Sequence, residues 1–358
     1  MNNREAIEKR EYDLLSPLAC KAAESKGRRF DEEQCEYRTD FQRDRDRIVH
    51  SKAFRRLIHK TQVFLAPEGD HYRTRLTHTL EVAQIARTVS RILAYNEDLT
   101  EAIALGHDLG HTPFGHVGEK VLDRIHSGGF KHNEQSVRIV EKLEKDGKGL
   151  NLTWEVRDGI LNHQTSGSPS TLEGAIVRIA DIIAYLGKDR QDAIRINTAN
   201  DETFFDDGIG SINQEIINNL EVSVIENSYG KDYIKMGAEH FEALRKSKIA
   251  NYSLIYNQTA KLTNLNDTVK PMMAEIYDKM YDDLVNNRKD SPVFKHHIDY
   301  INTVFPKRDE PYGQEDPHQI VIDYIASMTD NYFIDLHRFL FPQSPLSVKY
   351  MGYFEDLK

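Results

Sequence analysis

The stretch TLEGAIVRIADIIAYLGK, residues 171–188, decides the fold of this chain. Its pattern is helical, and a helix that is apolar on nearly all sides is a buried one. A single carboxylate, Asp181, lies in the middle of the apolar residues. A buried carboxylate costs free energy unless it is paired or bound to a metal. The stretch therefore predicts a central buried helix and a partner for Asp181 elsewhere in the chain. The apolar positions are Ile176, Val177, Ile179, Ala180, Ile182, Ile183 and Ala184.

The same helical periodicity continues on both sides of this stretch. A helix is predicted near residue 99, with Asp98 or Thr100 as its cap, and another begins with Thr112 as cap and Pro113 at its first position. Residues 76–95 predict a helix with one inward apolar stripe, made of Val82, Ile85, Ala86, Val89, Ile92 and Leu93. Further helices are predicted over 133–145, 233–247, 270–286 and 317–339, whereas 222–230 is the hardest stretch to assign.

Because β alternation is scarce, the predicted fold class is all-α. We expect one domain over residues 1–358, with a core at about 60–190 and a C-terminal helical part at about 211–358.

Composition excludes several classes of protein. The chain has 358 residues, of which 39% are hydrophobic, and no apolar run reaches the ~18 residues that a membrane span needs. The first thirty residues lack the apolar segment of a secretory signal. Cys20 and Cys35 are the two cysteines, which is too few for a thiolate zinc site and fits a reducing compartment. We expect a cytoplasmic protein with no membrane partner.

Charge is distributed unevenly along the chain. The net charge of −10 argues against a surface that coats nucleic acid. Residues 41–60, FQRDRDRIVHSKAFRRLIHK, nevertheless carry seven Arg and Lys against two Asp. Such a segment can attract a small anion such as a nucleotide phosphate, or it can be a helix face with internal ion pairs. The charge pattern leaves both interpretations open.

Histidines and carboxylates gather in IALGHDLGHTPFGHVGE, residues 103–119. A single inward histidine such as His78 is more often a core residue, but the adjacent His107 and Asp108 favour a metal site. Imidazole and carboxylate together suit a divalent transition metal. With Asp181 these residues form a set of two histidines and two aspartates, which leaves coordination positions for water and a substrate oxygen.

His116 and Glu119 are spaced i, i+3 and share one helix face. A carboxylate next to an imidazole orients it for proton transfer near neutral pH. The alternative is a helix start whose Glu119 only balances the helix dipole. We favour proton transfer, because the metal pair lies a few residues upstream.

These motifs, in this order, resemble the HD-domain superfamily and, more narrowly, the deoxynucleoside triphosphate triphosphohydrolases. The resemblance covers residues 37–190 almost continuously and is looser in the C-terminal third, where ASMTDNYFIDL at 326–336 is the clearest piece. The main motifs are DRDRIVHSKAFRRLIHKTQVF at 44–64, TRLTHTLEVAQIAR at 74–87, LGHDLGHTPFGHVGE at 105–119 and RIADIIAYLGKD at 178–189.

The resemblance implies a role for each candidate residue of the site. The metal ligands would be His78, His107, Asp108 and Asp181, holding Mn²⁺, Mg²⁺, Fe²⁺ or a similar divalent ion. The catalytic pair would be His116 and Glu119, and the phosphate contacts His111, His132 and Arg75. The sugar contacts would be Gln62, Val63, Tyr185, which crowds the 2′ position, and Asp189, which meets the 3′-hydroxyl. One position departs from the pattern: Ile182 replaces a phosphate-binding lysine of some relatives, so Lys188 or arginines of 41–60 would have to supply that cation.

The activity implied is hydrolysis of a deoxynucleoside triphosphate (dNTP) to deoxynucleoside and tripolyphosphate. The resemblance also implies a homo-oligomer, a tetramer or hexamer, and an activating nucleotide, for which Arg55 and Arg56 are candidate contacts. One alternative is another HD phosphohydrolase, acting as a 5′-nucleotidase or on cyclic nucleotides or ppGpp. A different class of alternative is a nucleotide sensor or a binder of single-stranded nucleic acid, a partner that we do not predict.

Overall fold

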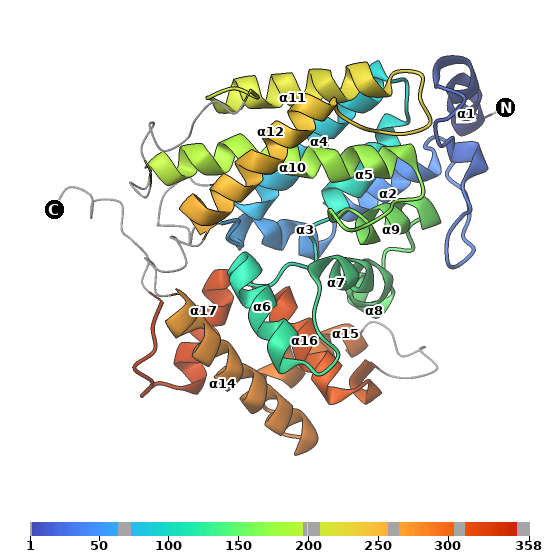
Figure 1. The fold of residues 1–358 in the computed structure, drawn as a ribbon. Coiled ribbons are helices and arrows are strands. Elements are labelled where there is room, and N and C mark those ends of the chain that lie inside the picture. The colour runs from blue at the N-terminus through green and yellow to red at the C-terminus, as the bar shows by residue number, and fades with distance from the viewer. Residues whose placement is uncertain are drawn as a thin grey trace. The chain divides into compact units, whose positions relative to one another are not determined.

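The computed structural model describes residues 2–63, 73–195, 199, 208–256, 265–303 and 312–348 (Figure 1). Within these residues every regular element is a helix, and the only β pairs are two isolated bridges, Arg28 with Thr153 and Thr61 with Thr74. This confirms the all-α prediction. None of the described helices combines the length and the apolar character that crossing a membrane requires. The predicted C-terminal helical part also includes 257–264, 304–311 and 349–358, which lie outside the described residues.

The chain forms two compact units, and each is interleaved in sequence. Unit 1 comprises Met1–His50, Thr77–His107 and Asn151–Thr259. Unit 2 comprises Ser51–Leu76, Asp108–Leu150 and Ala260–Lys358. The organisation as one domain stays a prediction.

Helix α10 (Leu172–Arg195) is the centre of unit 1. It contacts α5, α9, α11 and α12, as Figure 1 shows for the helices around it. No residue from 171 to 190 is exposed, and five of the seven predicted apolar positions are buried, whereas Ile179 and Ile182 are half-buried. The prediction of a central buried helix is confirmed at those five positions. The other helices of this unit are α1 (Asn3–Leu14), η1 (Ala22–Glu24), α2 (Asp40–Val49), α4 (Arg75–Ile92), α5 (Glu97–Gly106), α9 (Trp154–Leu161), α11 (Asn213–Ser228), α12 (Ala238–Asn251) and η5 (Tyr252–Tyr256).

Helices α4 and α5 differ from the predictions at their shared turn. The inward stripe of α4 is buried as predicted except for Ile92, which is 49% exposed, so its placement on the stripe was wrong. Ile92 is the last residue of α4, and the chain turns there through Ala94, which has φ of 58°. The cap of α5 is Asn96, whose side chain accepts from the Leu99 amide, rather than Asp98 or Thr100.

Unit 2 packs its helices around α14 (Leu265–Val285), which contacts α6, α16 and α17 (Figure 1). Its apolar core includes Phe114, Leu122, Met273, Ile276 and Phe333, all nearly inaccessible to solvent. The other helices of unit 2 are α3 (Lys52–Arg56), η2 (Leu57–His59), α6 (Gly115–Ile125), α7 (His132–Arg138), η3 (Ile139–Leu143), α8 (Glu144–Gly147), η6 (Phe294–Ile298), α15 (Asp299–Thr303), η7 (Tyr312–Gln314), α16 (Pro317–Ser327) and α17 (Asp330–Leu340).

The start of α6 corrects one prediction. The helix begins at Gly115 with Phe114 as its cap residue, not at Pro113 with Thr112 as its cap. The Thr112 hydroxyl donates to the Gly115 carbonyl instead of accepting from the helix. Phe114 has φ of 59°, in the left-handed region, so the chain makes an extra turn before the helix starts.

Two predicted helices of unit 2 are broken into shorter ones. The stretch predicted over 133–145 forms α7 followed by η3, and the stretch predicted over 317–339 forms α16 and α17. The second break lies at Met328 and Thr329, where the Thr329 side chain caps α17 by accepting from the Tyr332 amide.

Candidate active site

Two neighbouring helices of unit 1 supply the first pair of predicted metal ligands. His78 lies on α4 and is 1% exposed, and Asp181 lies on α10. His78 Nε2 is 3.0 Å from Asp181 Oδ1, so the stranded carboxylate has the partner that its burial requires. Burial raises the pKa of Asp181, but the hydrogen bond from His78 and the charges of His107 and His163 outweigh it, so the pKa is lowered overall. Asp181 is therefore a carboxylate at neutral pH and an available anionic ligand.

His107 completes the set within unit 1. It directly follows α5 and is fully buried. Its Nδ1 lies 2.6 Å from the Ala104 carbonyl oxygen, which can only accept, so Nδ1 carries the proton and Nε2 presents a lone pair. Nε2 lies 3.9 Å from Asp181 Oδ1. A backbone carbonyl that fixes the tautomer in this way is a usual support for a metal-binding histidine.

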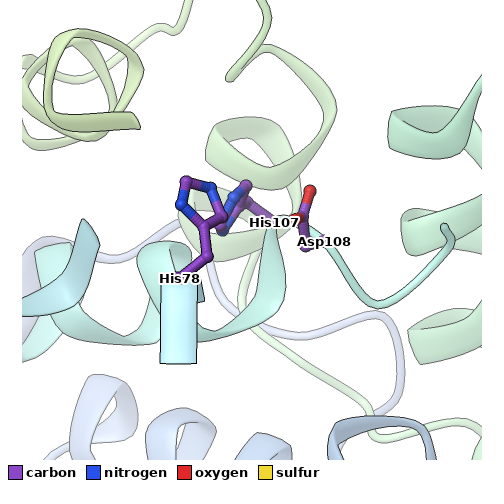
Figure 2. A group of neighbouring side chains, drawn as sticks. All are labelled: His78, His107 and Asp108. Atoms are coloured by element: carbon purple, nitrogen blue, oxygen red, sulfur yellow. The ribbon is translucent and has the colours of Figure 1, made fainter. Parts of the chain in front are cut away.

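His78, His107 and Asp108 form a group whose potential ligand atoms all lie within 4.8 Å of one another. Figure 2 shows the His78 ring beside the His107 ring, with the Asp108 side chain next to His107. Atoms that bind one ion at about 2.0–2.2 Å lie at most about 4.4 Å apart, so ligand atoms within 4.8 Å of one another are close to the arrangement that one ion requires. His78 Nδ1 is buried and has no hydrogen-bond partner among the described residues. Two imidazoles with two carboxylates fit a divalent metal, and the residues present are therefore suited to the ion that the resemblance implies.

Arg75 and His111 surround the Asp108 carboxylate. Arg75 is 1% exposed, and its Nη1 lies 2.8 Å from Asp108 Oδ2. His111 Nε2 lies 3.3 Å from Asp108 Oδ1. Burial and the neighbouring Arg75 charge lower the pKa of His111 well below its ordinary value, so this imidazole is neutral at physiological pH. The Arg75 Nε proton is buried and finds no acceptor in the described part of the chain, which makes it available to an anionic ligand.

Glu119 joins two histidines rather than one. As the i, i+3 spacing predicted, Glu119 Oε2 lies 3.1 Å from His116 Nδ1. Glu119 Oε1 also accepts from the His132 amide and lies 2.7 Å from His132 Nδ1. Burial raises the pKa of Glu119, yet the hydrogen bonds from His116 and His132 prevail and lower it overall. The carboxylate therefore stays ionised and fixes the orientation of both rings.

His132 in turn stacks on His111, with ring centroids 3.8 Å apart. Together with Asp108 these two histidines form a second group whose ligand atoms lie within 4.8 Å of one another. The chain passes very close at this point: a Cβ at Gly110 would lie 2.3 Å from the Ser136 amide nitrogen and 2.4 Å from the His132 carbonyl oxygen. Only glycine at position 110 allows α7 to bring His132 this near to His111.

The predicted sugar contacts occupy one face of α10, C-terminal to Asp181. Tyr185 is half-buried and Asp189 is 1% exposed. Burial, together with Asp181 and Asp189, raises the pKa of Tyr185, which stays a neutral phenol. Of the other predicted sugar contacts, Gln62 and Val63 are half-buried in unit 2.

Sequence reasoning missed three residues near the predicted ones. Tyr256 of η5 donates to Asp189 Oδ2 over 2.6 Å. Lys248 of α12 is half-buried, and its charge interacts with Asp181. It is therefore a candidate for the cation that some relatives supply with a lysine at the position of Ile182. His163 packs edge-on against His107, with centroids 4.9 Å apart. Lys248 and Tyr256 are eight residues apart, about two helical turns, but this spacing matches no motif that would have predicted a role for either residue.

The basic segment 41–60 is divided by the structure. Its arginines on α2 are held in ion pairs of unit 1, but their partners in the pairs given next lie on other segments rather than one turn away on the same helix. The pairs are Arg43 with Glu32, Arg45 with Asp98 and Glu101, and Arg47 with Glu32. Lys188, the other substitute considered for the missing lysine, pairs with Asp192 at 3.6 Å. Arg55 is exposed and Arg56 half-buried in unit 2.

Known protein families match parts of the chain, one of which contains the predicted metal ligands. Residues 75–186 match the HD domain, a span that contains His78, His107, Asp108 and Asp181. Residues 291–339 match the phosphohydrolase-associated domain. A deoxyguanosinetriphosphate triphosphohydrolase-like protein of Caldanaerobacter subterraneus subsp. tengcongensis is 51% identical to 96% of this chain and is covered over 97% of its own length. The chain belongs to the deoxyguanosinetriphosphate triphosphohydrolase-like family.

Other members of the deoxyguanosinetriphosphate triphosphohydrolase-like family match over a similar extent. The protein of Desulfatibacillum aliphaticivorans is 43% identical over 97% of this chain and 100% of its own length. That of Clostridium perfringens strain SM101 is 42% identical over 93% of this chain and 95% of its own. A solved structure of a hypothetical protein from Aquifex aeolicus covers 77% of the chain and is itself covered over 70%, with a TM-score of 0.42 and 20% identity, and is too distant to inform the site.

Proposed function

We propose that this protein hydrolyses deoxynucleoside triphosphates to a deoxynucleoside and tripolyphosphate, with a divalent metal as cofactor. The observation that carries the proposal is the group of His78, His107 and Asp108, with Asp181 against both histidines. A bound divalent ion would supply Lewis-acid stabilisation of charge on a phosphate oxygen. The names of the relatives, which refer to dGTP triphosphohydrolysis, support a nucleotide triphosphate as the substrate class.

The proposed reaction is the attack of water on the α-phosphorus. A new P–O bond forms to the water oxygen, and the bond between the α-phosphorus and the 5′-oxygen breaks. One proton leaves the water, and one proton is taken up by the departing 5′-oxygen. His116 is the group that we assign to proton transfer, because Glu119 holds its Nδ1 and leaves the other ring nitrogen directed away from the carboxylate.

Three side chains of unit 2 are suited to the phosphates. Arg75 has a buried Nε proton to offer, and a guanidinium binds phosphate oxygens through several parallel hydrogen bonds. His111 and His132 stack on each other beside Asp108, and their ring N–H groups can donate to phosphate oxygens. Stabilisation of charge that develops in the transition state is the larger contribution expected from these residues.

The sugar would be read on α10. We assign Tyr185 to the 2′ position, where its ring would exclude a hydroxyl group, and Asp189 to the 3′-hydroxyl. The Tyr256 hydroxyl already donates to one oxygen of Asp189 and so orients the carboxylate. Gln62 and Val63 are assigned to the deoxyribose, and Lys248 to a phosphate, in place of the lysine absent at Ile182.

We also propose a homo-oligomer, a tetramer or hexamer, with an activating nucleotide bound near Arg55 and Arg56. Arg55 is exposed. Burial lowers the pKa of Arg56, and the charge of Glu144 partly offsets this, so a phosphate anion would further stabilise the charged guanidinium. Sedimentation with and without nucleotide tests this, since an activator that assembles the protein must change its mass.

The test of the main proposal is a screen of the four dNTPs, singly and in pairs, with Mn²⁺ or Mg²⁺, that separates tripolyphosphate from pyrophosphate and orthophosphate. Pairs are included because an enzyme that needs an activator would be silent on single substrates. Tripolyphosphate with an equal amount of deoxynucleoside is the expected result. Release of orthophosphate or pyrophosphate would assign the protein to another phosphohydrolase activity, and no release under any condition would reject catalysis.

A further inference from the structure

One buried carboxylate of α17 accepts hydrogen bonds from two segments that lie far from it in sequence. Asp330 is 4% exposed. Its Oδ2 accepts from the Thr61 amide at 3.0 Å and also from the Thr61 hydroxyl. Its Oδ1 accepts from the Phe114 amide at 3.0 Å. Asp330 thus joins the residue before Gln62 to the residue before α6.

A buried lysine makes a second connection between the same segments. Lys60 is 2% exposed, and its ammonium donates to the carbonyls of His111 and Ala326. Ala326 is near the end of α16, four residues before Asp330. The carbonyl of Lys60 accepts from the Arg75 amide. Residues 326–330 are therefore linked to both ends of the 111–114 turn, indirectly through Lys60 at His111 and directly through Asp330 at Phe114.

The turn needs such support, because its conformation is an unfavourable one. Phe114 is a bulky residue with φ of 59°, and a residue of this kind is rarely left-handed without compensation. The two compensating contacts come from α17: the Asp330 carboxylate at the Phe114 amide, and the Phe333 ring packed edge-on against the Phe114 ring at 5.2 Å. Phe114 is also the cap residue of α6 and has no side-chain cap of its own.

The conformation of the Phe114 turn affects the start of α6, the helix that carries His116. Gly115 follows with φ of 54°, and a Cβ there would lie 2.8 Å from Arg75 Nη2 and 3.1 Å from the Gln62 carbonyl. His116 is the next residue, and Glu119 follows one turn later. The direction in which α6 leaves the turn therefore sets where His116 lies relative to Arg75 and His111.

We propose that Asp330 is a positioning residue for catalysis, which holds the Phe114 turn so that α6 presents His116 to the substrate. The proposal rests on the proposed function, and it gives a role to the phosphohydrolase-associated segment, residues 291–339, beyond packing. The hydrogen bonds of Asp330 go to Thr61 and Phe114, neither of which is a predicted metal ligand or substrate contact, so we expect the effect of Asp330 on kcat to come mainly through His116.

Asp330→Asn is the informative substitution because it keeps the size and removes one acceptor. The carboxylate accepts three hydrogen bonds, from the Thr61 amide, the Thr61 hydroxyl and the Phe114 amide. The amide side chain has one oxygen, so its NH₂ must face either the Phe114 amide or the Thr61 amide, donor to donor. One backbone N–H is then left without its acceptor. The matched control is Asp335→Asn on the same helix, where the carboxylate is exposed and pairs with Arg338.

The experiment has two independent readouts. Hydrogen exchange of the peptide containing residues 109–118 reports the turn without reference to activity, and we expect faster exchange in Asp330→Asn and no change in Asp335→Asn. Tripolyphosphate release reports function, and we expect kcat to fall about 10- to 100-fold with KM and metal content unchanged, below the ~10²–10⁴-fold attributed to an acid–base group. In a His116→Ala background, Asp330→Asn should lower kcat by less than about twofold, because the group through which it acts is absent.

Different outcomes distinguish this inference from the proposed function. One outcome is that Asp330→Asn exchanges faster while the wild-type protein releases no tripolyphosphate from any dNTP. That result would retain the role of Asp330 in the turn, but it would reject the proposed activity and with it the catalytic part of the inference. An active wild type with unchanged exchange and kcat in Asp330→Asn would overturn the inference alone, as would equal losses in the wild-type and His116→Ala backgrounds. If Asp330→Asn does not fold, Thr61→Val, which removes one of the three donors, must show the same changes at smaller size.

Discussion

Glu119→Gln is the substitution that most directly tests the assignment of the proton-handling group. The carboxylate contacts two imidazole rings and one amide, at 3.1 Å from His116 Nδ1, 2.7 Å from His132 Nδ1 and 3.0 Å from the His132 amide. Its side chain is 16% exposed, against 65% for His116. Glutamine has the same length but offers one oxygen and one NH₂ group. It can therefore keep only part of this arrangement.

The magnitude follows from the hydrogen bond that glutamine cannot make. The glutamine oxygen would satisfy the buried His132 donors, and its NH₂ would face His116, whose Nδ1 would then have to accept. That change of tautomer moves the His116 proton to the other ring nitrogen and removes the negative partner of an imidazole that becomes charged during proton transfer. One hydrogen bond to a charged group contributes about 1.5–3 kcal/mol, which corresponds to about 10- to 160-fold in rate. We expect kcat to fall within this range and KM to change little.

The assay is steady-state release of tripolyphosphate at saturating dNTP, with metal content and unfolding temperature measured on the same samples. Glu134→Gln on α7 is the matched control, since Glu134 is exposed and pairs with the exposed Lys131. A normally folded and metal-loaded Glu119→Gln enzyme with kcat within about twofold of the wild type would refute the reasoning, because so small a change is below the effect of one hydrogen bond to a charged group.

Three further predictions concern the metal, the sugar and pH. Asp108→Ala should remove bound metal and activity together, as measured by elemental analysis and product release, and turnover in a metal-free variant would reject the site. Tyr185→Ala should raise turnover of ribonucleotides relative to deoxyribonucleotides, measured as the ratio of kcat/KM values, and an unchanged ratio would remove Tyr185 from sugar selection. Oε1 of buried Glu173 accepts hydrogen bonds from the Cys20 and Asn96 amides, and burial raises the pKa of this carboxyl group to about 7. Its folded pKa is the higher one, so its stabilising contribution is complete below the unfolded pKa of about 4.5 and is lost as pH rises to about 7. Glu173→Gln should therefore gain about 3 kcal/mol relative to the wild type across this window, and parallel pH profiles of unfolding free energy would contradict this.

The sequence predicted those parts of the site whose geometry is set within one helix. His116 and Glu119 meet because i, i+3 residues share a face, and His78 lies in the interior because it continues the apolar stripe of α4. The need of Asp181 for a partner followed from the cost of burying a carboxylate, and His78 is that partner. The order of the motifs supplied the rest of the ligand set through the family resemblance.

Contacts between a side chain and a distant backbone group could not be predicted in the same way. Asp330 and the Phe114 amide are separated by 216 residues, and neither belongs to a periodic pattern. The second partner of Glu119 follows a turn and lies 13 residues away. The start of α6 was predicted from cap preferences, which favour Thr112, but the tertiary contacts of Phe114 with α17 decide it. A buried carboxylate and an aromatic contact outweigh the local preference there.

The position of Arg75 connects metal and substrate binding in the proposed site. In this structure its guanidinium pairs with Asp108, the same carboxylate that is assigned to the metal. Two cations would then share one carboxylate, and the repulsion between them is strong where solvent is excluded. A triphosphate brings the negative charge that relieves it, and the buried Arg75 Nε proton and the neutral His111 ring are ready to meet its oxygens. The carboxylate that holds Arg75 in the absence of substrate is therefore also the group through which substrate and metal would favour each other's binding.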